Sequence, residues 1–269
     1  MNAQHVLFIA VSLGSVACTA QAPTDINDIT RYLFREWDNP DPLVMQAGLT
    51  TLEKILEGKK LGPMGAGNDR LLQVSPIHKE DLTVTPFPMD KDPANTLGTL
   101  VTRESQWPVI DHARVQADPN QLPVEPNATV YVRTYLEPTD PSCLIDASCK
   151  ILRTTNEITR SNTTLQVTYT LLKNFRWITM ADGRLALCAR AWAPMTFHGS
   201  TGGILQSYSI DIFVPRPGDV TWRYQASYSE NELSIAVSGD LQVAVVTGAV
   251  EGALARADTI IGQRYHGLP

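Results

Sequence analysis

Four cysteines carry the most reactive side chains of this 269-residue chain, and Cys18 comes directly after an apolar stretch. All residues from Val6 to Val11 are apolar, and the small residues Ser15 and Ala17 precede Cys18. An apolar core of roughly 7 to 15 residues that ends at small residues is typical of an export signal. A cysteine at its end is the position where a bacterial lipoprotein is cleaved and acylated. The sequence therefore predicts a signal peptide over residues 1–17 and a lipid on Cys18.

Cleavage by an ordinary signal peptidase after Ala17 is the alternative. Residues 1–5 contain no Lys or Arg, and Ser15 replaces the leucine that is usual in lipoprotein cleavage sites. Cys18 would then be a free N-terminal thiol. No later apolar run approaches the roughly 20 residues of a membrane span, so we expect the membrane to be reached through the N-terminal lipid. The predicted location is the bacterial cell envelope, with attachment to the outer membrane.

Cys143 and Cys149 lie close together between two strand-like runs. An exported chain reaches an oxidising compartment, which favours a disulfide between them, and closing so small a loop would add roughly 2 to 3 kcal/mol. Half of a metal site is the alternative, although the spacing differs from the usual zinc pairs and no histidine is near. Cys188 falls inside a strand pattern and is expected to be a buried, inert thiol. We predict no metal and no cofactor.

The glycine-rich segment His198–Gly203 contains Ser200. Such loops can offer backbone N–H groups to an oxyanion or a phosphate, but this one has no lysine and precedes a strand, and the chain has no Gly-x-Ser-x-Gly elbow. A hairpin tip is the simpler interpretation. A hydrolase using Ser200 or the carboxylates Glu230 and Glu232 stays an alternative.

Asp111 and His112 could act as a base and its orienting partner only if the fold brought them together, because neighbours on a strand point to opposite faces. Aromatic residues with a polar tip are better candidates, since they suit a ligand pocket. Ordinary core packing is the alternative for each of them. The candidate ligand-binding residues are Tyr169, Tyr208, Trp222, Tyr224 and Tyr228.

Composition narrows the class of partner. Hydrophobic residues make up 43% of the chain and charged residues 19%, and the net charge is -6. These proportions fit a globular domain. Binding to nucleic acid requires clustered cations, so an acidic chain without a Lys/Arg cluster predicts no nucleic-acid partner.

The residues after the signal predict a single exported domain over 18–269. Apolar residues recur at helical spacing over 24–58 and predict a pair of helices. Residues 59–127 are rich in proline, and we expect an irregular layer there, with short strand-like pieces such as Val109-Ile110.

Apolar and polar residues alternate over 128–230, which predicts an antiparallel sheet with one buried face. Asp182-Gly183 marks one of its hairpins. The stretch 239–264 is predicted to form a long helix whose glycines and alanines keep it slim. A slim helix can approach a sheet closely or leave room beside it.

The predicted fold class is therefore α+β, with an N-terminal helix pair, an antiparallel β-meander and a long C-terminal helix packed on the sheet. This order of elements resembles the helix-grip arrangement of START and Bet v 1-like proteins, in which a sheet curls around a final helix. The strand that usually precedes the helix pair in that arrangement is not visible in this sequence.

The centre of the chain also resembles a group of lipoproteins of delta-proteobacterial type that has no assigned activity. The resemblance supports export and the disulfide, and no functional residue comes with it. The residues that carry it are 141–143, Cys149, Phe175-Arg176, 182–187 and 190–192.

The leading functional hypothesis is a non-enzymatic, lipid-anchored envelope protein that binds a hydrophobic small molecule or an envelope component. A surface scaffold or adhesion module is the second hypothesis, and a hydrolase is the third.

Overall fold

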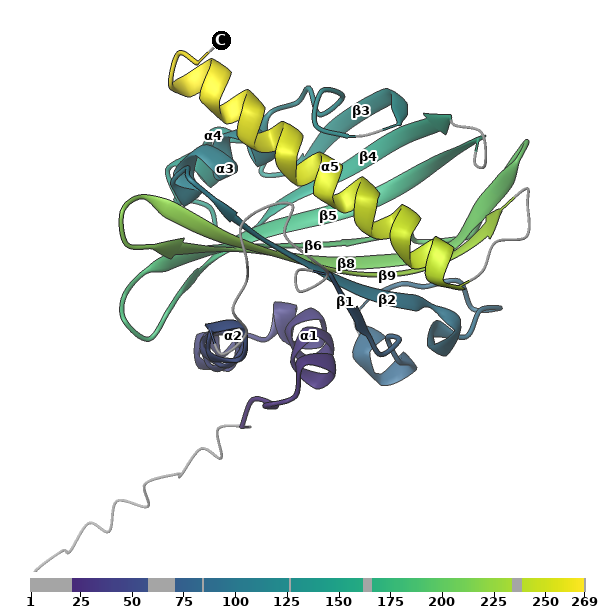
Figure 1. The fold of residues 1–269 in the computed structure, drawn as a ribbon, viewed down its shortest axis with the longest axis horizontal. Coiled ribbons are helices and arrows are strands. Elements are labelled where there is room, and N and C mark those ends of the chain that lie inside the picture. Colours follow the sequence, from purple (N-terminus) through teal and green to yellow (C-terminus); the bar gives the residue numbers. More distant parts are fainter. Residues whose placement is uncertain are drawn as a thin grey trace, which may run out of the picture.

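The computed structural model describes residues 21–57, 71–83, 85–125, 127–161, 166–233 and 239–268. A nine-stranded sheet forms its middle layer, with a helix pair on one face and a long C-terminal helix across the other (Figure 1). The predicted α+β class is confirmed. A final helix laid across the sheet is the helix-grip arrangement, so the resemblance in element order extends to the packing. The predicted signal peptide and Cys18 lie outside the described residues.

Every pairing in the sheet is antiparallel, and the strand order is β1-β2-β9-β8-β6-β5-β4-β3, with β7 paired to β8. The turn at Gly183, which has a positive φ of 85°, joins β5 to β6 as the sequence predicts. The strands are β1 (Leu71–Val74), β2 (Leu97–Ser105), β3 (Ala128–Glu137), β4 (Leu152–Ser161), β5 (Gln166–Thr179), β6 (Leu185–Trp192), β7 (Phe197–Gly199), β8 (Gly202–Arg216) and β9 (Val220–Leu233).

The helix pair consists of α1 (Ile26–Arg35) and α2 (Pro42–Glu57), joined through the short 3-10 helix η1 (Glu36–Asp38). Asp25 caps α1 by accepting a hydrogen bond from the backbone N–H of Asn27. The apolar faces of both helices share one buried core with β6, β8 and β9. We call the side of the sheet that they cover the helix-pair face.

The expectation of an irregular layer over 59–127 is wrong in two places. Leu97–Ser105 forms β2, which lies between β1 and β9 inside the sheet, and Val109–Ala117 forms the helix α3, where a strand-like piece was expected. None of the prolines lies inside β2 or α3. Pro93 opens the 3-10 helix η4 (Pro93–Asn95) and Pro108 is the N-cap of α3, where a missing N–H costs no helical hydrogen bond. The remaining short helix of this region is η3 (Lys79–Leu82).

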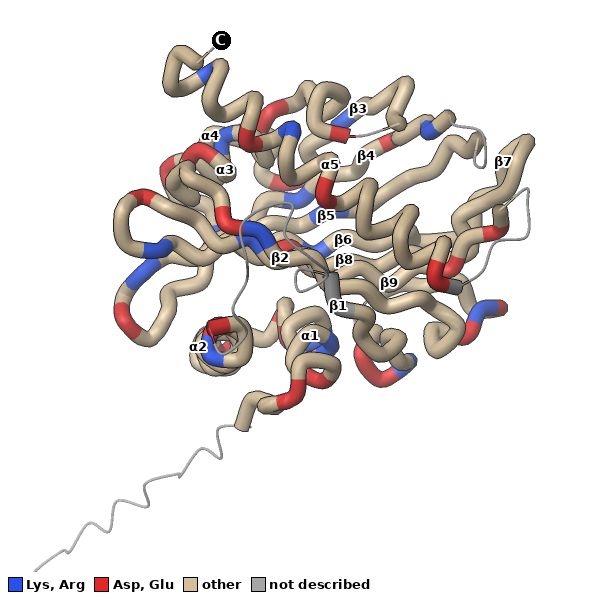
Figure 2. The backbone as a smooth tube through the Cα atoms, in the orientation of Figure 1, with Lys and Arg blue, Asp and Glu red and all other residues tan. Residues whose placement is uncertain are grey.

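Helix α5 (Gly239–Tyr265) covers the opposite side of the sheet, which we call the α5 face (Figure 1). Its first half carries no charged residue over positions 241–250 (Figure 2). In its second half, Ala257 and Ile261 are buried in one cluster with Val115 of α3. Among the described helices, none is long and apolar enough to cross a membrane.

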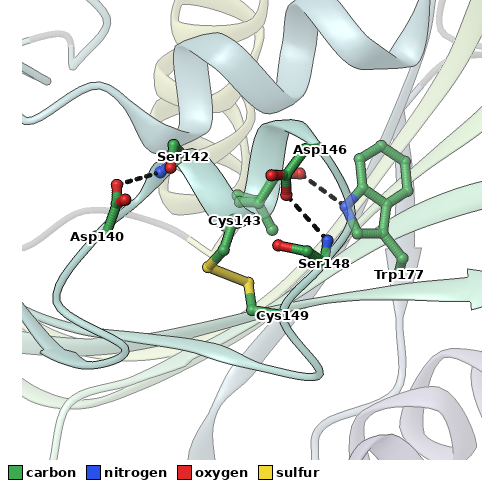
Figure 3. The surroundings of a disulfide bond; sticks show 8 residues. Asp140, Ser142, Cys143, Asp146, Ser148, Cys149 and Trp177 are labelled. Atoms are coloured by element: carbon green, nitrogen blue, oxygen red, sulfur yellow. Dashed lines mark hydrogen bonds between the residues drawn. A yellow bond between two sulfur atoms is a disulfide. The ribbon is translucent and has the colours of Figure 1, made fainter.

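The predicted disulfide between Cys143 and Cys149 is confirmed, and their Cα atoms are 5.1 Å apart (Figure 3). It closes the loop around the short helix α4 (Ser142–Ile145). Two side chains fix the same loop: Asp140 accepts from the backbone N–H of Ser142, and Trp177 donates from Nε1 to the carbonyl of Leu144 at 2.8 Å. The remaining free cysteine of the described chain, Cys188, is buried, and burial raises the pKa of its thiol to about 12, as expected for an inert thiol.

The carboxylate of Asp258 connects the second half of α5 to the sheet through hydrogen bonds and ion pairs. Asp258 accepts hydrogen bonds from Arg103 Nε at 2.8 Å and from the Ser105 hydroxyl at 2.7 Å, both on β2. Its backbone carbonyl accepts from Trp107 Nε1 at 2.9 Å. Arg223 of β9 lies 3.5 Å from the same carboxylate and also donates to the carbonyl of Leu254. Burial lowers the pKa of Arg223 to about 10, against the opposing attraction of Asp258.

The variant Asp258→Asn should be strongly destabilised. It keeps the shape of the side chain but leaves two buried or half-buried arginines without their counter-charge, a change that typically costs about 3 kcal/mol. Urea denaturation followed by circular dichroism would measure the loss in the free energy of unfolding. Glu251→Gln removes one charge from an exposed position of the same helix and is the control. Equal stabilities of the two variants would show that Asp258 does not fasten the helix.

His112 of α3 is buried beside the same network. The Ser105 hydroxyl donates to Asp258, so its oxygen accepts from Nε2 of His112 at 3.0 Å. Burial, and then the positive charges of Arg223 and Arg103, hold the pKa of His112 well below its usual value of 6.5. The imidazole is therefore neutral in the folded protein at every pH near neutrality.

This shift predicts acid sensitivity. In the unfolded chain His112 takes up a proton below about pH 6.5, while the folded imidazole does not, so the folded state loses about 1.4 kcal/mol per pH unit below that point. The variant His112→Gln should lack this component. Urea denaturation at pH 7.5, 6.5, 5.5 and 5.0 would show a shallower decline than in the wild type. Replacing the exposed His198 by Gln should leave the decline unchanged; an identical decline in His112→Gln would contradict the buried neutral state.

Candidate ligand-binding cavity

A cavity of about 520 Å³ lies between the first half of α5 and the sheet. Its floor is the β8–β9 hairpin, where Ser207 stands opposite Ser229 and Ser209 opposite Ser227. Because side chains alternate along a strand, these residues point to the α5 face while the residues between them point to the helix-pair face. Serine side chains are short, so this register leaves space above the floor.

The roof of the cavity is the slim part of α5. Most of its lining positions carry small or medium apolar side chains, and Gln242 is a polar exception. A slim helix can approach a sheet closely or leave room beside it, and the cavity between α5 and the sheet shows the second arrangement. Val245 lines the cavity and is 51% exposed, which places an opening to solvent at this end of the helix. The apolar roof residues are Val245, Val246, Ala249, Val250, Ala253 and Leu254.

One wall is built around Tyr169 of β5. Its ring lies beneath the guanidinium of Arg160, 5.6 Å from Cζ to the ring centroid, and Arg160 in turn pairs with Glu125 at 3.0 Å. Burial raises the pKa of the Tyr169 hydroxyl to about 12, so it stays protonated and can donate a hydrogen bond. Leu171 on the same strand extends the wall with apolar surface.

The inner end of the cavity is charged. Lys173 lies 3.0 Å from Oδ2 of Asp211 and also donates to Oε1 of Gln116 at 3.1 Å. The other oxygen of Asp211, Oδ1, is buried and has no hydrogen-bond partner among the described residues. Nε of Arg223 is also buried and has no hydrogen-bond partner among the described residues. Both residues line the cavity.

Further polar groups of the lining lack protein partners. Within the described chain, the hydroxyls of Ser207, Ser209 and Ser227 and the side-chain amide of Gln225 make no hydrogen bond to another residue. These half-buried groups form a row along the floor and face the cavity. They can therefore bond to water or to polar groups of a guest.

The aromatic candidates from the sequence do not share one site. Tyr169 lines the cavity. The rings of Tyr208, Tyr224 and Tyr228 belong to the core under the helix pair, although Tyr208 and Tyr224 also border the cavity across the sheet. Phe34 of α1 meets Tyr208 edge-on at 6.1 Å between ring centroids.

Trp222 packs against the same core from the sheet surface, where Arg216 stacks on its ring at 3.8 Å. Alternation along β8 and β9 places these aromatics on one face but cannot tell which layer covers that face. The polar positions between them were the signal for the cavity, because Asp211, Gln225 and the floor serines alternate out of phase with the aromatics.

The catalytic candidates are not assembled. Asp111 Oδ2 lies 2.7 Å from Nε2 of His266, whereas His112 bonds to Ser105, so the two neighbours have separate partners. The Ser200 hydroxyl donates to Oε1 of Gln166 at 2.8 Å at the exposed β7–β8 turn, which directs its proton away from any base.

Glu230 accepts from Gln206, and Glu232 faces the exposed His198 at 3.5 Å. The described residues contain no group of three or more His, Cys, Asp or Glu side chains that could hold a metal ion.

No protein-family model matches the chain, and no curated protein matches its sequence at a significant level. Solved structures with a similar fold include a STAR-related lipid transfer protein from Xanthomonas axonopodis, with 14% identity over 61% of this chain and 85% of the other and a TM-score of 0.43.

The protein TTHA0849 from Thermus thermophilus has 17% identity over 62% of this chain and 97% of the other, with a TM-score of 0.42. The Zhui aromatase/cyclase from a Streptomyces species has 10% identity over 64% of this chain and 99% of the other, with a TM-score of 0.41. At these identities the likeness concerns the fold alone.

Proposed function

We propose that this protein is an exported, lipid-anchored binding module of the cell envelope that holds a hydrophobic small molecule between α5 and the sheet. The observation that carries the proposal is the cavity of about 520 Å³, with its apolar roof and its unpaired polar floor. A pocket of this volume is within the range that holds small-molecule ligands. Binding alone, without catalysis, accounts for the arrangement of these groups.

The apolar roof supplies the affinity in this proposal. Each Å² of apolar surface removed from water contributes about 25 cal/mol, and the guest would bury its surface against Val250, Ala253 and Leu254. The half-exposed Val245 marks the side from which the guest enters.

The cavity can be tested with Nile red, a neutral dye that fluoresces in apolar sites. Wild-type protein should bind the dye with a saturable rise in emission. The variant Ala249→Trp fills the space under the roof and should weaken dye binding at least tenfold. Thr259→Trp places the same indole at an exposed position of α5 outside the lining and should change the affinity less than twofold. Undiminished binding by Ala249→Trp would refute the cavity as the binding site.

The envelope location and the lipid anchor rest on the apolar leader and Cys18 and are supported by the disulfide, which belongs in an oxidising compartment. A bacterial lipoprotein carries more than one acyl chain, and stable anchoring requires at least two membrane-binding signals. The anchor would keep the cavity close to a source of hydrophobic molecules.

Metabolic labelling with palmitate tests the anchor directly. Protein produced in a bacterial host should carry the label and fractionate with membranes, while Cys18→Ser should be unlabelled. Cys188→Ser is the control, because it removes a buried thiol from the domain and should leave the label in place. An unlabelled wild type whose mature N-terminus is a free Cys18 thiol would favour cleavage after Ala17 and plain secretion.

A scaffold or adhesion role is the second candidate, because the edge strand β3 exposes three large apolar side chains on its helix-pair side. Exposed apolar groups on a sheet edge favour association with another chain. A role of this kind would survive the Ala249→Trp substitution unchanged. The residues are Val130, Val132 and Leu136.

A further inference from the structure

We propose that the inner end of the cavity selects a guest that carries a hydroxyl group, and that Asp211 accepts the hydrogen bond from this hydroxyl. A guest with an apolar body and a neutral alcohol is therefore preferred over one with the same body and a carboxylate. This inference rests on the proposed binding function and specifies the chemical class of the ligand.

The first step is the unpaired oxygen of Asp211. Oδ2 is held by Lys173 at 3.0 Å, whereas Oδ1 is buried without a partner in the described chain. A buried acceptor without a hydrogen bond lowers the free energy of unfolding. Asp211 lines the cavity. The missing donor must therefore approach from the cavity side.

The second step is a donor close to that acceptor. In the β8–β9 register, Asp211 stands opposite Gln225 and Phe213 opposite Arg223. Asp211 and Arg223 are therefore diagonal neighbours on the same face of the hairpin, within reach of long side chains. Nε of Arg223 is buried and also unpaired within the described chain. A hydroxyl is both donor and acceptor, so one alcohol group complements this pair.

The third step is the charge at this end of the cavity. Lys173 is already committed to Asp211 and Gln116, and Arg223 lies beside Asp258. A carboxylate guest would meet the unpaired oxygen of Asp211 at close range, where like charges repel strongly because little water screens them. A neutral hydroxyl has no such penalty. The serine hydroxyls of the floor can bond to further polar groups along the same guest.

Displacement of Nile red by two matched probes tests the inference. The probes are 1-dodecanol and dodecanoate at pH 8, which share one alkyl chain and differ in the head group. Wild-type protein should bind dodecanol at least tenfold more tightly than dodecanoate. In Asp211→Asn the Lys173 ammonium loses its counter-charge, so dodecanoate should gain at least fivefold in affinity and the preference for the alcohol should disappear.

The control is Asp219→Asn, which removes the same charge from the exposed β8–β9 turn and should keep the wild-type preference. Equal or tighter binding of dodecanoate by the wild type would overturn the inference, and so would an unchanged preference in Asp211→Asn. If Asp211→Asn does not fold, the wild-type comparison decides alone. Nile red that binds but is displaced by neither probe would refute the hydroxyl guest and leave the cavity intact. Failure of Nile red to bind at all would refute the proposed function itself.

Discussion

The carboxylate of Asp258 is the contact on which the architecture of the α5 face depends. It joins α5 to Arg103 and Ser105 on β2 and to Arg223 on β9. Buried charges are stable only when they are paired and hydrogen-bonded, so this network fixes the second half of the helix at one height and one rotation. The first half follows as a rigid extension over the sheet, and the space beneath it becomes the cavity.

One face of the sheet carries a packed core, and the other carries the cavity. On the helix-pair face, aromatic side chains such as Tyr208 and Tyr228 fill a packed core with α1 and α2. On the α5 face, β8 and β9 present serines and Asp211, and Asp211 pairs with Lys173 of β5. The packed core on the helix-pair face stabilises the fold. The α5 face can therefore contain a cavity and a few unpaired polar groups.

Most of the elements could be predicted from sequence. The helix periodicity of 24–58 and 239–264, the alternation over 128–230 and the closeness of Cys143 to Cys149 all report local constraints, and each corresponds to an element or bond of the structure. The central position of β2 could not be predicted in this way. Its partner β9 is more than a hundred residues away along the chain, and proline density hid the strand between Pro93 and Pro108.

The sequence by itself determined that β8 and β9 have one aromatic and one polar face. It also determined that α5 has small side chains, which allow the helix either to approach a sheet closely or to leave room beside it. Only the tertiary structure decided that the helix pair covers the aromatic face and that α5 stands off from the polar one. The physical reason is that periodicity records a difference between two faces, whereas the layer that covers each face is set by the packing of the whole chain and by the Asp258 network.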